Sequence, residues 1–368
     1  MKRLVLAGGG HSHVEVLLRF GRNPVPGVEL TLISPGRHTP YSGMLPGLVA
    51  GHYTWAQSHI DLERLCRFAG AHHLDDRLAG LDLYAKRARC ESGDERSFDL
   101  LSLDIGSIPP LPAVPDAVAH GIAVKPVEDF LDAWAELQRQ ARERRLRVVV
   151  VGGGAGGVEL TLAMQHRLQS IGAKTQFSIV TDSERILPDH ARGVRRRLEC
   201  VLAQRGVKTH AGRRAIAAEP GYLVLEDDIH VAADRIIWAT GANAAPFLQQ
   251  SGLRTDNAGF VLIDENLQSI SHTGIFAAGD VASMVARPRP KSGVYAVRQG
   301  PPLADNLRRA LTEQMLEPYF PQPVALALIS TGDKYAIASW GPLAWAGAWV
   351  WRWKDRIDRR FVEKYRCP

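Results

Sequence analysis

Closely spaced cysteines are absent from this chain of 368 residues, which has only four, at Cys66, Cys90, Cys200 and Cys367. These four are far apart and form no Cys-x-x-Cys motif. The sequence therefore predicts neither a zinc site nor a disulfide framework, and we expect a reducing compartment and no metal. Long apolar runs are lacking too, since none approaches the roughly 20 residues of a membrane-spanning helix. The apolar run at residues 4–7 is too short for a signal peptide and predicts a first strand.

A large excess of charge of either sign is also lacking. Lysine and arginine number 45 against 39 aspartates and glutamates, which gives a net charge of +6. No nucleic-acid-binding motif accompanies this mild basicity, so we expect no nucleic-acid partner. The charge suits an anionic cofactor or an anionic membrane surface. The length is typical of a globular protein of two to three domains.

The clearest pattern in the chain lies at residues 147–164, where a valine-rich run enters a glycine-rich turn and then a helical pattern. Strand, turn and helix in this order are the context of a dinucleotide-binding fingerprint. Gly152 allows the tight turn, Gly154 lets the backbone approach a pyrophosphate, and Gly157 lets helix and strand pack closely. The pyrophosphate is expected at the helix N-terminus. The candidate contacts here are Gly152, Gly154, Ala155, Gly156, Gly157 and Glu159.

A similar turn follows the first strand at residues 8–13, Gly-Gly-Gly-His-Ser-His. The third motif glycine is replaced by His13, whose ring we expect to line the pocket, because residues 11–13 occupy the turn that touches a bound phosphate. Ser34 follows the strand predicted at residues 28–33 and stands where an acidic residue for a ribose hydroxyl is usual. The loop at residues 35–47 is rich in proline and glycine and predicts a wall for a ring system. The candidate contacts are Gly8, Gly10, His11, Ser12, His13, Ser34, Pro35, Arg37, Gly43 and Pro46.

Two similar units, at about residues 1–112 and 117–243, follow from the two turns, with a proline-dense crossover at 109–115. Periodicity predicts helices at residues 60–69, 127–144 and 192–205. Strands are expected at residues 74–89, 96–103, 177–181, 207–210 and 235–241, with a hairpin-like region at 213–232.

Residues 274–280 form a third signal, a short apolar run that ends in Gly279-Asp280. Together with the two glycine turns and Ala-Thr-Gly at 239–241, the ordered set resembles the two-dinucleotide-binding-domain flavoproteins, the pyridine nucleotide-disulfide oxidoreductase superfamily, over residues 1–310. The resemblance implies an α/β fold with two Rossmann-like domains. An NAD(P)H-binding domain, 114–244, is inserted in a discontinuous FAD-binding domain, 1–113 and 245–320, and a tryptophan-rich amphipathic tail follows at 321–368. It also implies cofactor contacts at Gly106, Gly241, Gly279, Asp280, Val294 and Ala296.

The residues after the strand at 177–181 bear on the choice between NADH and NADPH. Asp182 and Glu184 would repel a 2′-phosphate, although Arg185 is close to both in sequence. We therefore expect FAD and NADH as cofactors, with NADPH as an open alternative.

The electron acceptor is indicated by the missing redox cysteines. Without them, the chain resembles type II NADH dehydrogenases, which are membrane-associated NADH:quinone oxidoreductases, although Val294 and Arg298 replace the two glutamines of their quinone motif. Residues 38–47 and 290–300 resemble more closely a subgroup found fused to selenide, water dikinase. That resemblance suggests a link to selenium metabolism.

Four side chains are candidates for the reactive site. Lys125 resembles a lysine near the flavin in many relatives, where a cation stabilises the negative charge of reduced flavin. Tyr295 and Arg298, with Lys291, are expected to line an acceptor pocket. The N–H groups of residues 294–296, at a predicted helix start, would face the flavin.

The tail carries large apolar residues at every fourth position, with basic residues between them. A basic, tryptophan-rich amphipathic helix is typical of an interfacial membrane anchor. The alternative is a helix that packs on the flavin domain or on a second subunit. We expect a cytoplasmic protein, with peripheral contact at the inner face of the membrane as a second expectation. The stripe consists of Trp345, Trp349, Trp353, Ile357, Phe361 and Tyr365.

These observations together predict an FAD-dependent NAD(P)H oxidoreductase that passes electrons to a quinone or small acceptor without redox cysteines. One alternative is a reductase of a selenium or sulfur compound. Another is a flavoprotein whose nucleotide state signals to a partner. The sequence makes no prediction of oligomeric state.

Overall fold

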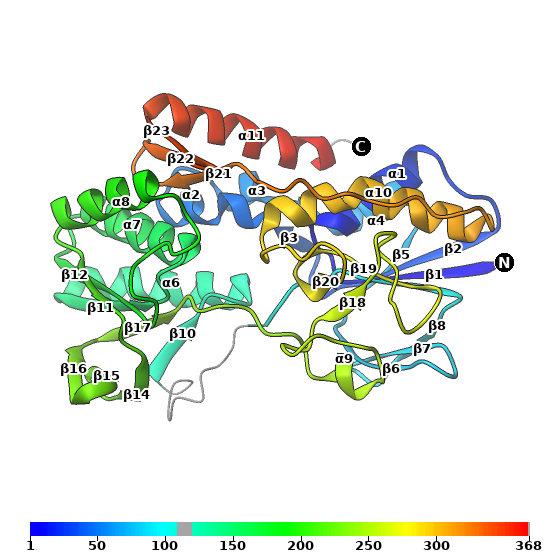
Figure 1. Ribbon diagram of the computed structural model, residues 1–368, viewed down its shortest axis with the longest axis horizontal. Coiled ribbons are helices and arrows are strands. Elements are labelled where there is room, and N and C mark those ends of the chain that lie inside the picture. The colour runs from blue at the N-terminus through cyan, green and yellow to red at the C-terminus, as the bar shows by residue number, and fades with distance from the viewer. Residues whose placement is uncertain (109–119, 367–368) are drawn as a thin grey trace.

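The computed structural model describes residues 1–108 and 120–366. The expected boundary at 113/114, the proline-dense crossover and Cys367 fall outside these described residues. Within them, two parallel five-stranded sheets occupy opposite halves of the molecule (Figure 1). The first has the order β19-β9-β1-β2-β5, with strands Ile275–Ala277, Leu100–Leu103, Lys2–Ala7, Val28–Ile33 and His72–Leu74. The second has the order β10-β17-β11-β12-β13, with strands Gly121–Ala123, Arg235–Trp238, Leu146–Val151, Thr175–Thr181 and Lys208–Ala211.

The chain leaves the first sheet after β9, builds the second sheet, and returns to the first with β19. Central strands of both sheets are buried almost throughout, which explains their continuous runs of leucine and valine. This topology confirms the α/β fold in which one Rossmann-like unit is inserted into another.

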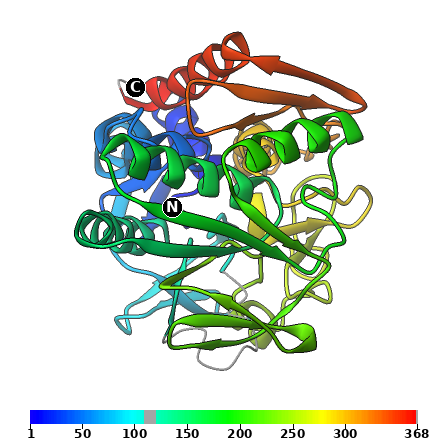
Figure 2. The same ribbon diagram turned by 90° about the vertical axis from the view of Figure 1, so that its left-hand side faces the viewer.

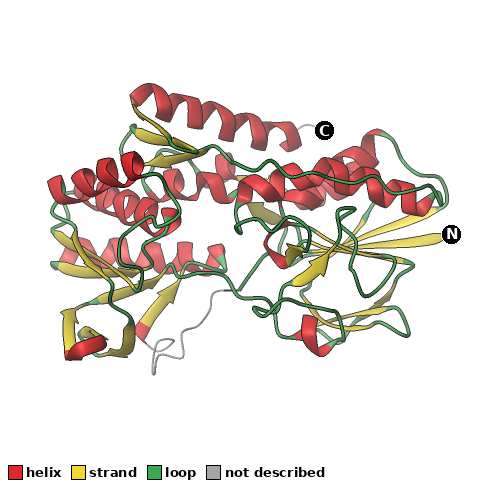
Figure 3. Cartoon of the chain, viewed as in Figure 1, coloured by secondary structure: helices red, strands yellow, loops and turns green. Residues whose placement is uncertain are grey.

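Helices cover both sheets. The first unit carries α1 (His11–Arg22), α4 (Leu62–Ala69) and α10 (Gly293–Leu311). The second carries α6 (Val127–Glu143), α7 (Ala155–Ser170) and α8 (Arg192–Gln204). Asp61 caps α4 by accepting the Arg64 N–H at 3.0 Å, so this helix begins two residues later than periodicity predicts. Figure 3 shows these helices around the strands of each half.

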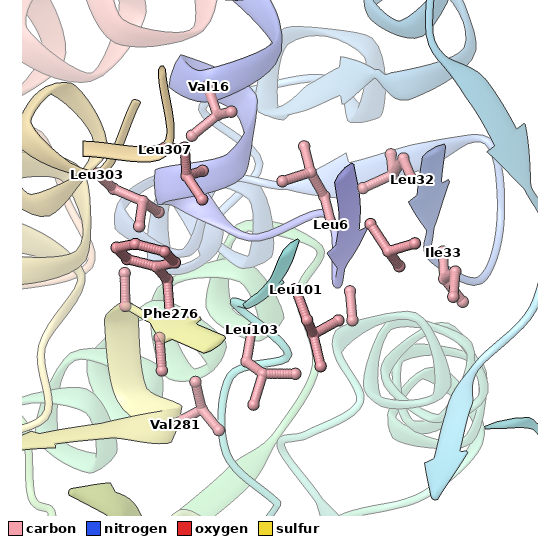
Figure 4. Packing of buried hydrophobic residues seen from close by; sticks show 14 of the residues in the cluster. Leu6, Val16, Leu32, Ile33, Leu101, Leu103, Phe276, Val281, Leu303 and Leu307 are labelled. Carbon is pink, nitrogen blue, oxygen red and sulfur yellow. The ribbon is translucent and has the colours of Figure 1, made fainter. Parts of the chain in front are cut away.

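The core of the first unit forms where α1 and α10 lie against the sheet. Leu6, Leu32 and Phe276 project from three of its strands, while Val16, on α1, and Leu303, on α10, face them (Figure 4). All five side chains are fully buried. The glycine turn between β1 and α1 is therefore held by a packed core on either side of it.

Smaller elements complete the two units. Near the first turn lie β3 (His38–Pro40), η1 (Ser42–Met44), α2 (Leu45–Val49), α3 (Trp55–Ser58) and β4 (His59–Asp61). Antiparallel sheets are formed by β6 (Leu78–Asp82), β7 (Arg87–Cys90) and β8 (Glu95–Ser97), and by β14 (Ala215–Glu219), β15 (Tyr222–Leu225) and β16 (Ile229–Ala232). The latter three strands form the hairpin region expected at 213–232, with η2 (Glu226–Asp228) between β15 and β16. The remaining elements are α9 (Phe247–Gln250), β18 (Val261–Ile263), η3 (Gly279–Val281) and β20 (Ala282–Met284).

The C-terminal region forms an antiparallel sheet of β21 (Ala327–Ser330), β22 (Ala336–Trp340) and β23 (Leu343–Gly347), followed by α11 (Ala348–Arg366). The expected helical stripe is wrong at its first position, because Trp345 lies in β23 opposite Ala338. Gly341, two residues before this strand, and Gly347, its last residue, both have positive φ. In Figures 1 and 2, α11 lies along the top of the molecule, above both halves.

Among the described residues, no helix combines the length and the apolar character that crossing a membrane requires.

Candidate functional site

The glycine turn between β11 and α7 leaves little space for side chains. A Cβ on Gly152 would lie 2.2 Å from the Ala239 carbonyl oxygen, and one on Gly157 would lie 2.1 Å from the Gly152 carbonyl oxygen. Gly152 also has φ of +134°. A Cβ on Gly154 or Gly156 would meet open space. The turn therefore combines a tight backbone with an open side, and the N-terminus of α7, which begins at Ala155, faces an anion-binding position.

A cavity of about 1050 Å³ begins at this turn and extends to the other unit. Its lining includes Gly154, Asp182 and Gly241 of the second unit, and Lys125 together with Asp280 of the first unit, to which Lys125 donates. A dinucleotide bound at Gly154 thus shares one cavity with Asp280, which follows β19 of the first sheet.

The acidic residues expected to select NADH are separated in space. Asp182 lines the large cavity, but Glu184 and Arg185 line a different hollow, of about 260 Å³, beside α8. Arg213 and Arg214 line the large cavity together with Asp182. The sequence did not indicate these two arginines, because the pairing of β13 with β12 brings them there.

The turn between β1 and α1 is built around Asp104, a residue that directly follows β9. Its Oδ2 accepts the N–H of Ser12 at 2.8 Å and of His13 at 3.0 Å, and so caps α1. A Cβ on Gly10 would lie 2.4 Å from this oxygen, and one on Gly8 would lie 2.3 Å from the Asp104 carbonyl oxygen. Burial raises the pKa of the Asp104 carboxyl well above its usual value. In the sequence, the only indication of a role for Asp104 is its position directly after a predicted strand.

The ring of His13 does not line the pocket, which corrects the expectation from the sequence. The side chain is 0% exposed and lies between the turn and the sheet. Its Nδ1–H donates to the Gly8 carbonyl oxygen at 2.7 Å, and Nε2 lies 2.8 Å from Ser102 Oγ. Burial lowers the pKa of His13 to about 4, so the ring is neutral and accepts from the Ser102 hydroxyl. Position 13 is the one where the motif usually has a glycine, and the small side chain of Ser102 leaves room there for the His13 ring.

The next candidates follow β2. Ser34 is buried, and its Oγ accepts the Gly9 N–H at 3.1 Å, which ties the end of β2 to the turn. Pro35 and Arg37 are exposed. Arg37 pairs with Asp61 at 2.6 Å, so its guanidinium is directed to α4.

The loop after β3 contacts both the first turn and the tail. His11 Nε2 lies 3.2 Å from Ser42 Oγ, and burial lowers the pKa of His11 to about 4. The Gly43 carbonyl oxygen accepts from Lys354 Nζ, on α11, at 2.7 Å. Pro46 is buried in α2, which packs against α7.

Lys125 connects the two units. Its Nζ donates to Ser107 Oγ at 2.8 Å and to Asp280 Oδ2 at 3.1 Å. Gly106, with φ of +72°, makes the turn that presents Ser107. Ser107 was not indicated by the sequence, because it reaches Asp280 only through the pairing of β9 with β19.

The helix α10 begins at Gly293, so Val294, Tyr295 and Ala296 form its first turn as expected. Ser12 Oγ donates to the Ala296 carbonyl oxygen at 2.7 Å, which joins the starts of α1 and α10. Gly279 N–H donates to Gln299 Oε1 at 2.7 Å.

The acceptor candidates on α10 differ in their surroundings. Tyr295 is buried and lines a small hollow beside Asp280. Lys291 lines both this hollow and the large cavity, with Nζ 3.9 Å from the centre of the Phe260 ring. Arg298 is exposed and lines neither.

Glu159 faces the C-terminal sheet, not the dinucleotide cavity, which corrects its place among the expected cofactor contacts. Its Oε1 accepts the Ser330 N–H at 2.7 Å. Burial raises the pKa of Glu159 to about 7, while nearby Lys354 opposes that shift. Lys354 itself pairs with Asp358 at 2.9 Å. The tail is thus joined by polar contacts to both glycine-turn units.

Comparison with known proteins identifies the family to which this chain belongs. Residues 2–300 match the family described as Pyridine nucleotide-disulphide oxidoreductase. The NADH dehydrogenase-like protein Rv1812c of Mycobacterium tuberculosis is 27% identical over 224 residues, which cover 58% of this chain and 56% of that protein. This match spans only about half the length of that relative. The demethylphylloquinone reductase NdbB of Synechocystis is 25% identical over 382 residues, covering 100% of this chain and 92% of that protein.

Two solved structures share the fold. The sulfide:quinone oxidoreductase of Aquifex aeolicus has a TM-score of 0.84 and 18% identity, covering 100% of this chain and 92% of that one. NDH2 of Plasmodium falciparum, solved with NADH, has a TM-score of 0.79 and 15% identity, covering 99% and 97%.

Proposed function

The chain belongs to the pyridine nucleotide-disulphide oxidoreductase family, and on this premise we propose that it is an FAD-dependent NAD(P)H oxidoreductase that reduces a quinone. The observation that carries the proposal is the single cavity that runs from Gly154 to Lys125 and Asp280. Several relatives are named as NADH dehydrogenases or quinone reductases, among them the type II NADH:quinone oxidoreductase of Haemophilus influenzae.

The residues present fit both cofactors. Gly154 and Gly156 leave open space beside the start of α7, where the pyrophosphate of a nicotinamide dinucleotide would bind. In the first unit, the N-termini of α1 and α10 meet through Ser12 and Ala296, and Asp280 lies at the end of β19. Bound FAD would take a hydride from the nicotinamide and release two electrons to the acceptor.

Lys125 is proposed to hold Asp280 in place and to supply positive charge at the flavin. Its Nζ is held by both Ser107 and Asp280, so the ammonium is oriented before any cofactor binds. A fixed cation near the position where negative charge develops lowers the energy of the reduced state. The Val294 N–H, at the positive end of α10, would act in the same sense, whereas the Ala296 N–H already donates to the Ser292 carbonyl oxygen at 3.3 Å.

The proposal is tested by steady-state NADH oxidation with a quinone analogue. Turnover that depends on the quinone is the expected result. NADH-reduced flavin that persists in the presence of every acceptor would contradict it and favour a signalling flavoprotein. In the same assay, Arg298→Ala tests the acceptor role expected from the sequence. Because Arg298 lines neither the large cavity nor the small hollow beside Asp280, we expect equal values for all acceptors, and a selective loss with an anionic acceptor would restore Arg298 to the acceptor site.

A second candidate, reduction of a selenium or sulfur compound, is favoured by a contact between residues 38–47 and 290–300. These segments carry the resemblance to the subgroup fused to selenide, water dikinase. Added at Gly293, a Cβ would lie 3.1 Å from Ser42 Oγ, so the two segments meet beside His11. An acceptor panel with selenium and sulfur compounds distinguishes this candidate, because quinone turnover would then be the slower reaction.

Peripheral binding at the inner face of a membrane is proposed for the C-terminal region. Trp349 and Trp353 on α11 are 48% and 39% exposed, and Trp340 at the end of β22 is 51% exposed. Arg192 and Arg196 are exposed on α8, which packs against β22 and β23. Exposed tryptophans beside basic side chains suit an anionic lipid surface.

Vesicle sedimentation tests this surface. Full-length protein is expected to bind vesicles with anionic lipid, and Trp349→Ser with Trp353→Ser is expected to reduce that binding. The control is Trp134→Phe, since Trp134 is buried in α6. Equal binding by all three proteins would refute membrane contact through α11.

A further inference from the structure

Two arginines stand at the nucleotide end of the large cavity, next to Asp182. After β13 the chain turns across the end of β12. Gly212 N–H donates to the Ser183 carbonyl oxygen at 2.8 Å, and Arg213 N–H donates to the Thr181 carbonyl oxygen at 3.0 Å. These bonds fix the backbone of Arg213 beside the strand end where a ribose hydroxyl is usually bound.

The guanidinium groups already face carboxylates, but those pairs are exposed. Arg213 pairs with Asp227, whose side chain is 73% exposed, and Arg214 pairs with Glu226 at 2.7 Å, with side chains 69% and 40% exposed. Exposed ion pairs contribute little net stability, because water screens them and ordering the long side chains opposes them. Both guanidinium groups can therefore exchange their partners for a more highly charged ligand at little cost.

Of the two acidic residues expected to repel a 2′-phosphate, only Asp182 lines the large cavity. Glu184 and Arg185 line the hollow beside α8, and their mutual contact of 3.5 Å is exposed. Asp182 and Asp189 both line the cavity and oppose a 2′-phosphate, whereas Arg213 and Arg214 favour it.

We propose that Arg213 and Arg214 form a subsite for the 2′-phosphate of NADPH, so that this chain accepts NADPH as well as NADH. Arginine binds phosphate oxygens through charge-assisted, often bidentate hydrogen bonds. Asp182 supplies the acceptor for the free 2′-hydroxyl of NADH. The inference rests on the proposed function, since it concerns the specificity of the same nucleotide site.

Calorimetric titration of the FAD-loaded protein with NADP⁺ and with NAD⁺ tests the subsite without turnover. Arg213→Ala with Arg214→Ala is expected to weaken NADP⁺ about tenfold or more, equivalent to about 1.4 kcal/mol, and to leave NAD⁺ within about twofold. Raising the salt concentration is expected to weaken NADP⁺ more than NAD⁺. Arg185→Ala is the matched control, because it removes a nearby arginine outside the cavity.

A second pair of changes has the opposite expected sign and guards against a folding defect. Asp227→Asn with Glu226→Gln frees both guanidinium groups and is expected to tighten NADP⁺. The subsite is overturned if wild-type protein does not bind NADP⁺, or if neither double variant changes the ratio of the two dissociation constants. Anaerobic addition of NADH separates the two proposals. Reduced flavin with an unchanged ratio overturns only the subsite, whereas flavin that stays oxidised with NADH and NADPH overturns the proposed function as well.

Discussion

Single residues at the first turn depart from the usual motif and compensate for one another. His13 occupies the position of a small residue, and Ser102 on β9 provides both space and a hydrogen bond for its ring. The Asp104 carboxylate accepts hydrogen bonds from two N–H groups at the start of α1 that would otherwise have no partner within the helix. The first turn is therefore more strongly tied to its own sheet than the second turn, where Gly154 and Gly156 face open space.

Replacing His13 is expected to change how stability depends on pH. The folded pKa of about 4 lies below the ordinary 6.5, so the unfolded chain binds the proton first. The contribution of neutral His13 is complete above that ordinary value and is lost as pH falls through the interval to the folded pKa. Between pH 7 and pH 5 this amounts to roughly 2 kcal/mol for a fully buried ring.

Urea unfolding of wild-type protein and His13→Gln at pH 7 and pH 5 measures this effect. The variant is expected to be less stable at pH 7, because the core is disturbed, but to lose less stability on acidification. A fall in stability of the same size for both proteins would show that His13 is not the group that titrates.

The positions that could be predicted from the sequence are those set by neighbours along the chain. Gly152, Gly154 and Gly157 act within one strand–turn–helix segment, so their spacing indicates the turn. Asp104 and Ser107 act through strand pairing with distant segments, and no local pattern reveals that. The direction of the His13 ring depended on the size of Ser102, which is 89 residues away.

At the level of elements, the contact between β11 and α7 depends on one glycine. Gly157→Ala would bring Cβ to 2.1 Å from the Gly152 carbonyl oxygen, so helix and strand must separate. We expect a loss of several kcal/mol, in the upper range of overpacking costs. Gly156→Ala is the matched control, since its Cβ would meet open space on the same helix.

Thermal unfolding of the two glycine variants measures the difference. Gly156→Ala is expected to keep a melting temperature near that of wild type, whereas Gly157→Ala is expected to lower it clearly. Similar melting temperatures for both would contradict the close contact between α7 and β11.

Elements near the C-terminus show where periodicity fails. Trp345 continues the spacing of α11 by four residues, yet it lies in β23, because Gly347 ends the strand and pairing with β22 satisfies its backbone. The spacing from Trp349 to Tyr365 does describe α11, although Phe361 and Tyr365 face the protein and Trp349 and Trp353 do not. The four-residue spacing in the sequence does not show which of these side chains are buried and which are exposed.

Across the whole molecule, the tail joins the two dinucleotide-binding units. Lys354 on α11 contacts Gly43 of the first unit and Asp358, and it lies near Glu159 of the second unit. Its side chain and that of Asp358 are 13% and 5% exposed. Such a buried pair matters chiefly because removal of one partner leaves the other charged and unpaired.

Lys354→Met is accordingly expected to cost about 3–5 kcal/mol of unfolding free energy. Urea unfolding measures the cost, and limited proteolysis shows whether α11 is released first. Arg67→Ala is the control, because the Arg67–Glu63 pair is exposed and contributes at most about 1 kcal/mol. Equal costs for the two variants would contradict a tail that is held by buried charge.

The proposed function requires that a nicotinamide bound at Gly154 reduce a flavin near Asp280 through one shared cavity. Anaerobic stopped-flow mixing of the FAD-loaded protein with NADH measures this step directly. We expect rapid loss of the oxidised-flavin absorbance in wild-type protein and a much slower loss in Lys125→Ala. Flavin that remains oxidised in the presence of saturating NADH would contradict hydride transfer through this cavity.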